Sequence, residues 1–152
     1  MENLDIAVRK LASQEVDKFI ELIGLFEVVF EMEAFSMPSR NHLQRLLAQE
    51  NFGVFVAEHE GTMVGGLTTY VLEQYYSERP LAYIYDLAVA VDFQRQGIGQ
   101  QLIAEVLRHY KLEGFEEVFV QADKVDAYAL DFYRKTKPTE EEDVSHFYYS
   151  LS

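Results

Sequence analysis

A chain of 152 residues, about half of them apolar, has the length of one domain that buries a substantial core. It contains no cysteine, which excludes disulfides, thiolate zinc sites and a cysteine acyl-enzyme. Its 26 acidic residues against 13 lysines and arginines give a formal net charge of −13, which opposes binding to a nucleic-acid backbone. This charge favours a cationic partner, although acidity by itself also promotes solubility.

No apolar run approaches the roughly 20 residues that a membrane span needs. Residues 1–10 lack the basic and apolar segments of a secretory signal. We therefore expect a soluble, cytoplasmic protein with no membrane partner. The four histidines show no ligand spacing, so no metal site is expected.

The first third of the chain predicts one strand and two helices. Residues 6–11 alternate weakly between apolar and polar side chains, as a strand does, and residues 15–30 are rich in apolar side chains, as a buried helix is. Ser39 is a favourable N-cap, so a second helix is expected over residues 40–50.

The middle third predicts three strands. Residues 54–58 and 62–72 are rich in β-forming side chains and flank Gly61, which suits the unusual dihedral angles of a hairpin turn. A third strand is expected over residues 81–91. Because short loops join these neighbouring strands, they are expected to form an antiparallel meander.

The last third predicts a long amphipathic helix over residues 97–112 that stops at Gly114. A short buried strand over residues 118–122, a helix over residues 127–134 and a last strand over residues 144–151 follow. With no repeat or linker to divide it, the chain is expected to form a single mixed α/β domain over residues 1–152.

One segment joins a predicted strand directly to the N-terminus of the long predicted helix: Gln94-Arg95-Gln96-Gly97-Ile98-Gly99. The unpaired amides and the dipole of a helix N-terminus bind anions, and glycine lets a phosphate approach closely. Alternatively, Gly99 serves only the close packing of helix on strand. A Rossmann fingerprint is excluded because Leu102 stands at its third glycine, and the lysine of a Walker loop is absent. Coenzyme A fits the remaining class of phosphate-bearing ligands.

Residues 83–89, which read Tyr-Ile-Tyr-Asp-Leu-Ala-Val, and the following Gln94-x-x-Gly97-x-Gly99 resemble the acetyl-CoA motif of the GNAT superfamily of N-acetyltransferases. The resemblance extends over nearly the whole chain in element order. Residues 83–89, 120–123 and 146–147 are similar in particular to the aminoglycoside 3-N-acetyltransferase branch. The resemblance implies an acyl-CoA N-acyltransferase fold, in which helices flank a central mixed sheet with two splayed parallel strands.

The same resemblance implies that acetyl-CoA gives its acetyl group to an amine of a cationic small molecule in a ternary complex. Pantetheine would pair with the backbone of Leu87 and Val89. Gln94 and Arg95 would shape the loop. The pyrophosphate would accept hydrogen bonds from the backbone amides of four loop residues: Gln96, Gly97, Ile98 and Gly99.

Attack of an amine on a thioester requires a proton acceptor for the ammonium and a proton donor for the departing thiolate. The family places a tyrosine on the helix after the second splayed strand as the donor, and Tyr133 matches that position; its alternative role is packing. Asp86 is the first candidate base, directly or through water, because polyamine acetyltransferases of the superfamily also carry an acid there. Its alternative role is a structural hydrogen bond. His146 is a weaker second base.

The resemblance breaks after the tyrosine helix. The usual glycine is absent and Lys135-Thr136-Lys137-Pro138 stands in its place, so the exit of this helix is expected to differ.

Acidic side chains supply the candidate substrate contacts: Glu31, Asp123 and Glu142. Solvated acids on an exposed face are the alternative. Acids around the amine suit an aminoglycoside, but they also suit a polyamine, another small amine or a basic peptide. Two further alternatives are an acyl-CoA-binding module without turnover and a purely structural protein. The aromatic residues 146–149 favour either the edge of a homodimer or core packing.

Overall fold

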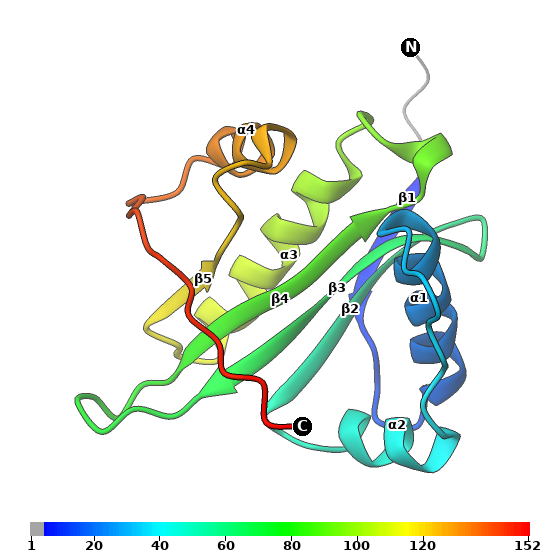
Figure 1. Cartoon of the computed structure of the whole chain (residues 1–152), viewed down its shortest axis with the longest axis horizontal. Helices are drawn as coiled ribbons and strands as arrows, with labels where there is room; N and C mark the ends of the chain where they lie inside the picture. Colours follow the sequence, from blue (N-terminus) through cyan, green and yellow to red (C-terminus); the bar gives the residue numbers. More distant parts are fainter. Residues whose placement is uncertain (1–4) are drawn as a thin grey trace. The chain divides into compact units, whose positions relative to one another are not determined.

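The computed structural model describes residues 5–152 and contains one five-stranded sheet with helices (Figure 1). By compactness the chain forms two units, which divide after Gln121. The first unit holds the whole sheet and three α-helices. The second unit, Ala122–Ser152, holds the helix α4 (Ala127–Lys135).

The sheet has the strand order β1-β2-β3-β4-β5. The first four strands are antiparallel neighbours and β5 runs parallel to β4, which confirms the predicted meander within a mixed sheet. The strand bounds are β1 Ile6–Lys10, β2 Phe52–His59, β3 Thr62–Leu72, β4 Leu81–Val89 and β5 Glu117–Val120.

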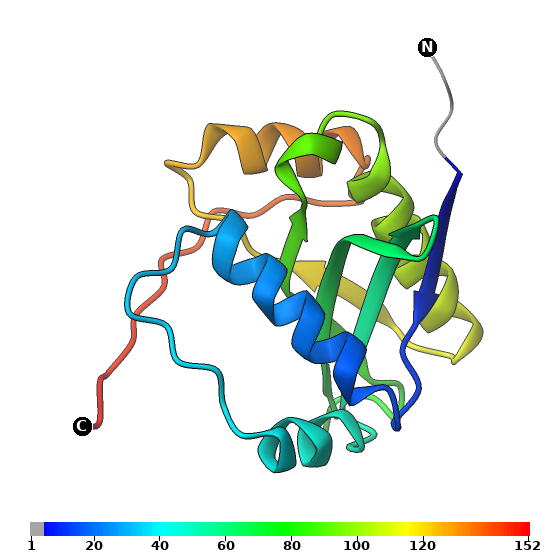
Figure 2. The same ribbon diagram turned by 90° about the vertical axis from the view of Figure 1, so that its right-hand side faces the viewer.

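The helices of the first unit cover both faces of this sheet (Figure 2). They are α1 (Val16–Val29), α2 (Arg40–Leu47) and α3 (Ile98–Leu112). The ring of Phe19 on α1 lies 5.6 Å from that of Phe52. On α3, the ring of Tyr110 lies 6.0 Å from that of Phe55. Because side chains alternate along a strand, Phe52 and Phe55 of β2 point to opposite faces, and α1 and α3 lie on opposite sides.

Close packing between α1 and the sheet requires a glycine at position 66. A Cβ at Gly66 would stand 2.6 Å from a Leu22 methyl and 2.8 Å from the Phe55 carbonyl oxygen. Leu22 is fully buried and belongs to the core between α1, α2 and the sheet. This contact fixes α1 against β3.

Local signals for the ends of elements are confirmed. Ser39 caps α2 by accepting a hydrogen bond from the amide of His42. Glu60 and Gly61 both have positive φ, as a two-residue type I′ hairpin turn requires. At the end of α3, Gly114 has φ +83° and its amide donates to the Lys111 carbonyl, as in a Schellman motif.

Three predicted strands differ clearly from the structure. The strand expected to be buried over residues 118–122 ends at Val120 and is only partly buried. The strand expected over residues 81–91 ends at Val89, because Val91–Phe93 form a 3-10 turn named η1. The strand expected over residues 144–151 is wrong: no helix or strand follows Lys135 in the described chain. Its side chains are exposed, with Phe147 at 81%. A β-forming sequence becomes a strand only when its backbone finds a ladder partner, and here none pairs with it.

Candidate functional site

A β-bulge interrupts β4 at Tyr85 and Asp86. Leu87 pairs with Leu67 and Ile84 pairs with Thr69, so two residues of β4 lie opposite the single residue Thr68. A bulge of this kind bends the strand and redirects side chains. It therefore resets the alternation of faces along β4 and turns Asp86 towards the face that carries α1, the side on which Tyr83 also lies.

The Asp86 carboxyl group is half-buried, and this burial raises its pKa. Among residues 5–152, no cation or hydrogen-bond donor contacts it. The pKa values of Tyr70 and Tyr83 are raised by burial, then by Tyr85 and by the charge of Asp86, so the carboxylate lies near these phenols. An acid with a raised pKa and no partner is suited to receive a proton or a cation.

Beyond the bulge, one edge of β4 is open. The parallel pairing of β5 with β4 covers only Leu81 to Ile84 and ends at Val120. The segment 85–89 of β4 therefore has no strand partner on this side in the described part of the chain, although Leu87 and Val89 still pair with β3 on the other side. An open backbone edge offers amides and carbonyls to an extended ligand.

The loop after η1 has a backbone shaped for an anion. Arg95 and Gly97 both adopt the left-handed conformation, with φ +63° and +84°. Alternation of this kind turns successive amides into a common concavity, which binds phosphate groups. Gly97 is also the N-cap of α3, where no side chain takes the first amides and no acidic residue lies in the first turn. The free amides therefore remain available at Ile98 and Gly99.

Two glutamines fix this loop to the preceding segment. The side-chain amide of Gln94 donates to the Val89 carbonyl at 2.9 Å, and that of Gln96 donates to the Asp92 carbonyl at 3.4 Å. Gln94 thus ties the loop to the last residue of β4. The open strand edge and the anion loop are consequently consecutive parts of one structural segment.

An apolar hollow lies between the C-terminal part of α1 and η1. Its lining is Leu25, Val28, Val29, Ala90, Val91, Asp92 and Phe93. Glu31 follows α1 with φ +51° and is exposed. The end of α1 therefore contributes both an apolar surface and an exposed acid to the first unit.

The second unit carries Tyr133 on α4. Asp126 caps this helix by accepting from the amide of Ala129 at 3.0 Å. After the helix, the Thr136 hydroxyl donates to the Tyr133 carbonyl at 2.6 Å, and Lys137 has φ +59°. Lys137 thus adopts the left-handed conformation that glycine usually supplies after a helix, so the exit keeps that geometry on a different residue.

Several acidic side chains of the second unit already accept hydrogen bonds from other residues of that unit. Glu141 accepts two hydrogen bonds from Arg134, and Asp143 accepts one from Lys124 at 2.7 Å. Asp123 accepts from the amide of Val125 and so stabilises a local turn. Glu142 lies between the two paired acids and is exposed.

The predicted residues therefore fall into two groups. Asp86, Leu87, Val89 and the loop 94–99 follow one another along the first unit, and Glu31 belongs to the same unit. Tyr133, Asp123 and Glu142 belong to the second unit. The sequence reasoning missed the tyrosines around Asp86, for which the spacing of Tyr83 and Tyr85 was the available signal.

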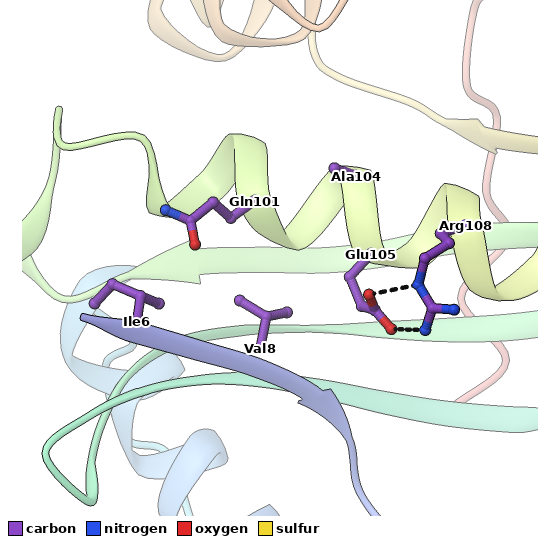
Figure 3. A pocket seen from close by; sticks show the side chains of 6 residues that line it. All are labelled: Ile6, Val8, Gln101, Ala104, Glu105 and Arg108. Carbon is purple, nitrogen blue, oxygen red and sulfur yellow. Dashed lines mark hydrogen bonds and ion pairs between the residues drawn. The ribbon is translucent and has the colours of Figure 1, made fainter. Parts of the chain in front are cut away.

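A separate shallow hollow lies between β1 and α3 (Figure 3). It is lined by Ile6, Val8, Gln101, Ala104, Glu105 and Arg108. Its two charged side chains, Glu105 and Arg108, are hydrogen-bonded to each other. The hollow thus offers a ligand no unpaired charge.

In the described residues, no helix is long and apolar enough to cross a membrane. The same residues contain no group of three or more His, Cys, Asp or Glu side chains that could hold a metal ion.

The chain is similar to solved structures over nearly its whole length. The aminoglycoside acetyltransferase meta-AAC0020, from an uncultured soil metagenomic sample, is 65% identical in a complex with trehalose, with a TM-score of 0.95 and 97% of each chain covered. In its complex with sisomicin, that protein is 64% identical, with a TM-score of 0.96 and the same coverage. The aminoglycoside acetyltransferase HMB0005, also from an uncultured soil metagenomic sample, is 34% identical over 98% of this chain and 100% of its own, with a TM-score of 0.90.

A curated relative is the mycothiol acetyltransferase of Saccharomonospora viridis, which is 31% identical over 109 residues. That match covers 69% of this chain but 36% of the relative, so the chain spans about a third of its length. The family model described as "Acetyltransferase (GNAT) family" matches residues 19–137, which include the bulge, the open strand edge, the anion loop and α4. The chain therefore belongs to the GNAT family of acetyltransferases.

Proposed function

We propose that this chain transfers the acetyl group of acetyl-CoA to the 3-N amine of an aminoglycoside by direct transfer in a ternary complex. The observation that carries the proposal is the unpartnered Asp86 carboxylate at the bulge of β4, directly before an open strand edge and an anion loop. Similarity over 97% of the chain to an aminoglycoside acetyltransferase, one of whose structures contains sisomicin, supports this substrate class.

Acetyl-CoA fits the first unit in the order of its chemical parts. Pantetheine is proposed to hydrogen-bond to the backbone of Leu87 and Val89 beyond the bulge. The pyrophosphate is proposed to take amides of the loop, from Gln96 to Gly99, with Arg95 adding a cation beside it. Gln94 holds the loop at the end of β4 and so sets the distance between these two subsites.

The chemical step involves three proton transfers. The substrate ammonium gives a proton to Asp86, directly or through water, and the neutral amine attacks the thioester carbonyl. As the tetrahedral intermediate collapses, the carbon–sulfur bond breaks and Tyr133 donates a proton to the thiolate. The N-protonated amide then loses one proton, which returns the phenol to its neutral form through solvent, and Asp86 releases its proton to solvent. The role of Tyr133 rests on its match to the family motif.

Three acids are proposed to contact the other ammonium groups of the substrate: Glu31, Asp123 and Glu142. Glu142 is the best candidate among the acids of residues 141–143, because Glu141 and Asp143 already form ion pairs within the chain. A homodimer is also proposed, because a second copy would cover the exposed rings of residues 147–149. We expect the enzyme to act in the cytoplasm as one functional domain.

The test is thiol release from acetyl-CoA in the presence of a gentamicin-like aminoglycoside, spermidine or a basic peptide. The wild-type chain is compared with Asp86→Asn and Tyr133→Phe. We expect turnover with the aminoglycoside and a loss of about 10²- to 10⁴-fold in kcat in each variant. Turnover only with spermidine or the peptide would show that the substrate is a polyamine or a peptide and not an aminoglycoside. Coenzyme A binding without any turnover would favour a binding module.

The pH profile provides a second readout for Asp86. Because the group must be ionised to accept a proton and burial raises its pKa, kcat/KM is expected to fall as the pH drops through that raised pKa. Asp86→Asn should remove this acidic limb. A limb that persists unchanged in the variant would contradict the assignment of Asp86 as the base.

A further inference from the structure

A row of aromatic rings crosses four strands on one face of the sheet. Phe52, Tyr70, Tyr83 and Phe119 lie directly opposite one another in the ladders of β2, β3, β4 and β5. The rings of Phe52 and Tyr70 are 5.1 Å apart, and those of Tyr83 and Phe119 are stacked 4.8 Å apart at an interplanar angle of 7°. Cross-strand aromatic pairs of this kind stabilise a sheet.

This row begins in the core and emerges at the surface. Phe52 is buried beneath α1, whereas Tyr70, Tyr83 and Phe119 are only half-buried. Tyr83 is held in place because its hydroxyl donates to the side-chain oxygen of Gln121 at 3.1 Å. The exposed part of the row is therefore continuous with the core at Phe52 and is held at Tyr83 by a hydrogen bond.

Tyr85, which lies in the bulge of β4, packs against the exposed part of this row. Its ring lies 5.6 Å from that of Tyr70 and 5.9 Å from that of Tyr83, at interplanar angles of 84° and 82°. Two edge-to-face contacts fix its orientation, yet the residue is 58% exposed. Without the bulge, Tyr85 and Asp86 would point to opposite faces of β4; with it, both stand beside the same two phenols.

Aromatic faces and an anion thus converge on one point, which we call the tyrosine platform: Tyr70, Tyr83, Tyr85 and Asp86. Ring faces attract cations, and flat aromatic surfaces cover the apolar faces of saturated rings. An apolar protein partner is disfavoured because it would bury the lone charge of Asp86. A ring that carries an ammonium group satisfies both the aromatic faces and the carboxylate.

We propose that the tyrosine platform binds the amine-bearing ring of the substrate, so that the ring packs on Tyr85 while its ammonium group reaches Asp86. This rests on the proposed function and deepens it, because it assigns substrate specificity to the three tyrosines of the platform, which have no part in the proton transfers. Tyr85 is the specificity-determining residue, and Tyr70 and Tyr83 hold its ring in position.

The test separates the ring of Tyr85 from its hydroxyl. Tyr85→Leu removes the aromatic face, and Tyr85→Phe keeps it. For Tyr85→Leu, we expect the KM for the aminoglycoside, and its Kd by calorimetry without acetyl-CoA, to rise about 3- to 30-fold. The kcat and the KM for acetyl-CoA should stay within about twofold, and Tyr85→Phe should resemble the wild type. Tyr75→Leu is the matched control, because Tyr75 is also an exposed tyrosine, at 88%, and lies in the loop before β4, outside the tyrosine platform.

The outcomes distinguish failure of the platform proposal from failure of the proposed function. If aminoglycosides are acetylated normally and Tyr85→Leu leaves both KM and Kd unchanged, the platform is wrong and the function stands. If no aminoglycoside is acetylated but Tyr85→Leu still weakens its binding, the platform stands and the function is wrong. An equal loss in Tyr85→Phe would show that the hydroxyl carries recognition, which also overturns the proposal. Equal melting temperatures confirm that each variant is folded.

Discussion

At the scale of single residues, backbone conformation decides what the end of β4 can bind. Gly97 has φ +84° at the N-terminus of α3, and Gly114 has φ +83° just after its C-terminus. A Cβ at either position would meet no atom within 4 Å. The two glycines therefore have the same conformational requirement, and they differ in whether a phosphate is expected beside them.

Replacing either glycine by alanine should cost stability equally. We expect Gly97→Ala and Gly114→Ala each to lose about 1 kcal/mol of unfolding free energy, because a side chain is strained in the left-handed conformation. Only Gly97→Ala should raise the KM for acetyl-CoA several-fold. Denaturant unfolding and initial rates measure the two effects, and an equal rise in KM for Gly114→Ala would refute a local role of Gly97 in phosphate binding.

The charge of Asp86 is proposed to serve activity, but it destabilises the folded protein. Its pKa is raised by burial, so the folded state binds its proton more tightly than the unfolded chain does. The destabilising effect of its charge is therefore absent below the unfolded pKa and fully present once the pH exceeds the folded pKa. We expect Asp86→Asn to be at least as stable as the wild type at pH 7, and to lose that advantage near pH 4. Thermal unfolding at the two pH values measures this.

At the scale of elements, an ion-pair network ties β1, α1 and β2 together. The Glu58 carboxylate accepts from Arg9 at 3.0 Å and from Lys18 at 2.9 Å. Arg9 also donates to Glu15 at 2.9 Å. Glu58 is the least exposed partner, with 13% of its side chain accessible. This network stabilises the packing of α1 on β1 and β2, and it contains none of the candidate site residues.

Glu58 should contribute to stability in a pH-dependent way. Although burial acts to raise its pKa, the hydrogen bonds from Lys18 and Arg9 lower it overall. Its contribution is thus present above the unfolded pKa and is lost as the pH falls through the lower folded pKa. We expect Glu58→Gln to cost about 1 kcal/mol at pH 7, given its partly exposed partners, and almost nothing below about pH 3. Glu50→Gln, at an exposed position, is the control for removing one charge.

At the scale of the whole molecule, the net charge of −13 acts on every charged ligand. Long-range attraction of a polycation is screened once the Debye length falls to about 10 Å, near 0.1 M salt. We therefore expect the KM for an aminoglycoside to rise several-fold between about 0.02 and 0.3 M NaCl. The KM for acetyl-CoA, an anion, should not rise in parallel. A parallel rise would indicate a general effect of salt on the fold.

Much of the fold and part of the site follow from local sequence. The Ser39 cap, the Glu60-Gly61 turn and the Gly114 stop each depend on a few consecutive residues, and each was predicted. The position of the anion loop before α3 was predicted for the same reason, because its glycines and the following helix are adjacent in the chain; its binding of an anion stays a prediction. Local dihedral preferences and hydrogen bonds between near neighbours are sufficient for such features.

Pairing between distant strands decided the rest. The segment 144–151 has a strand-forming composition but no ladder partner, so its sequence alone gave the wrong prediction. The bulge exists because β3 and β4 change register between Leu67 and Thr69, which no single segment encodes. The raised pKa of Asp86 depends on its burial in the folded chain. The sequence by itself determined most of the elements, the position of the loop before α3 and the family motif; the tertiary structure decided which side chains surround Asp86, because register and burial arise only when strands pair.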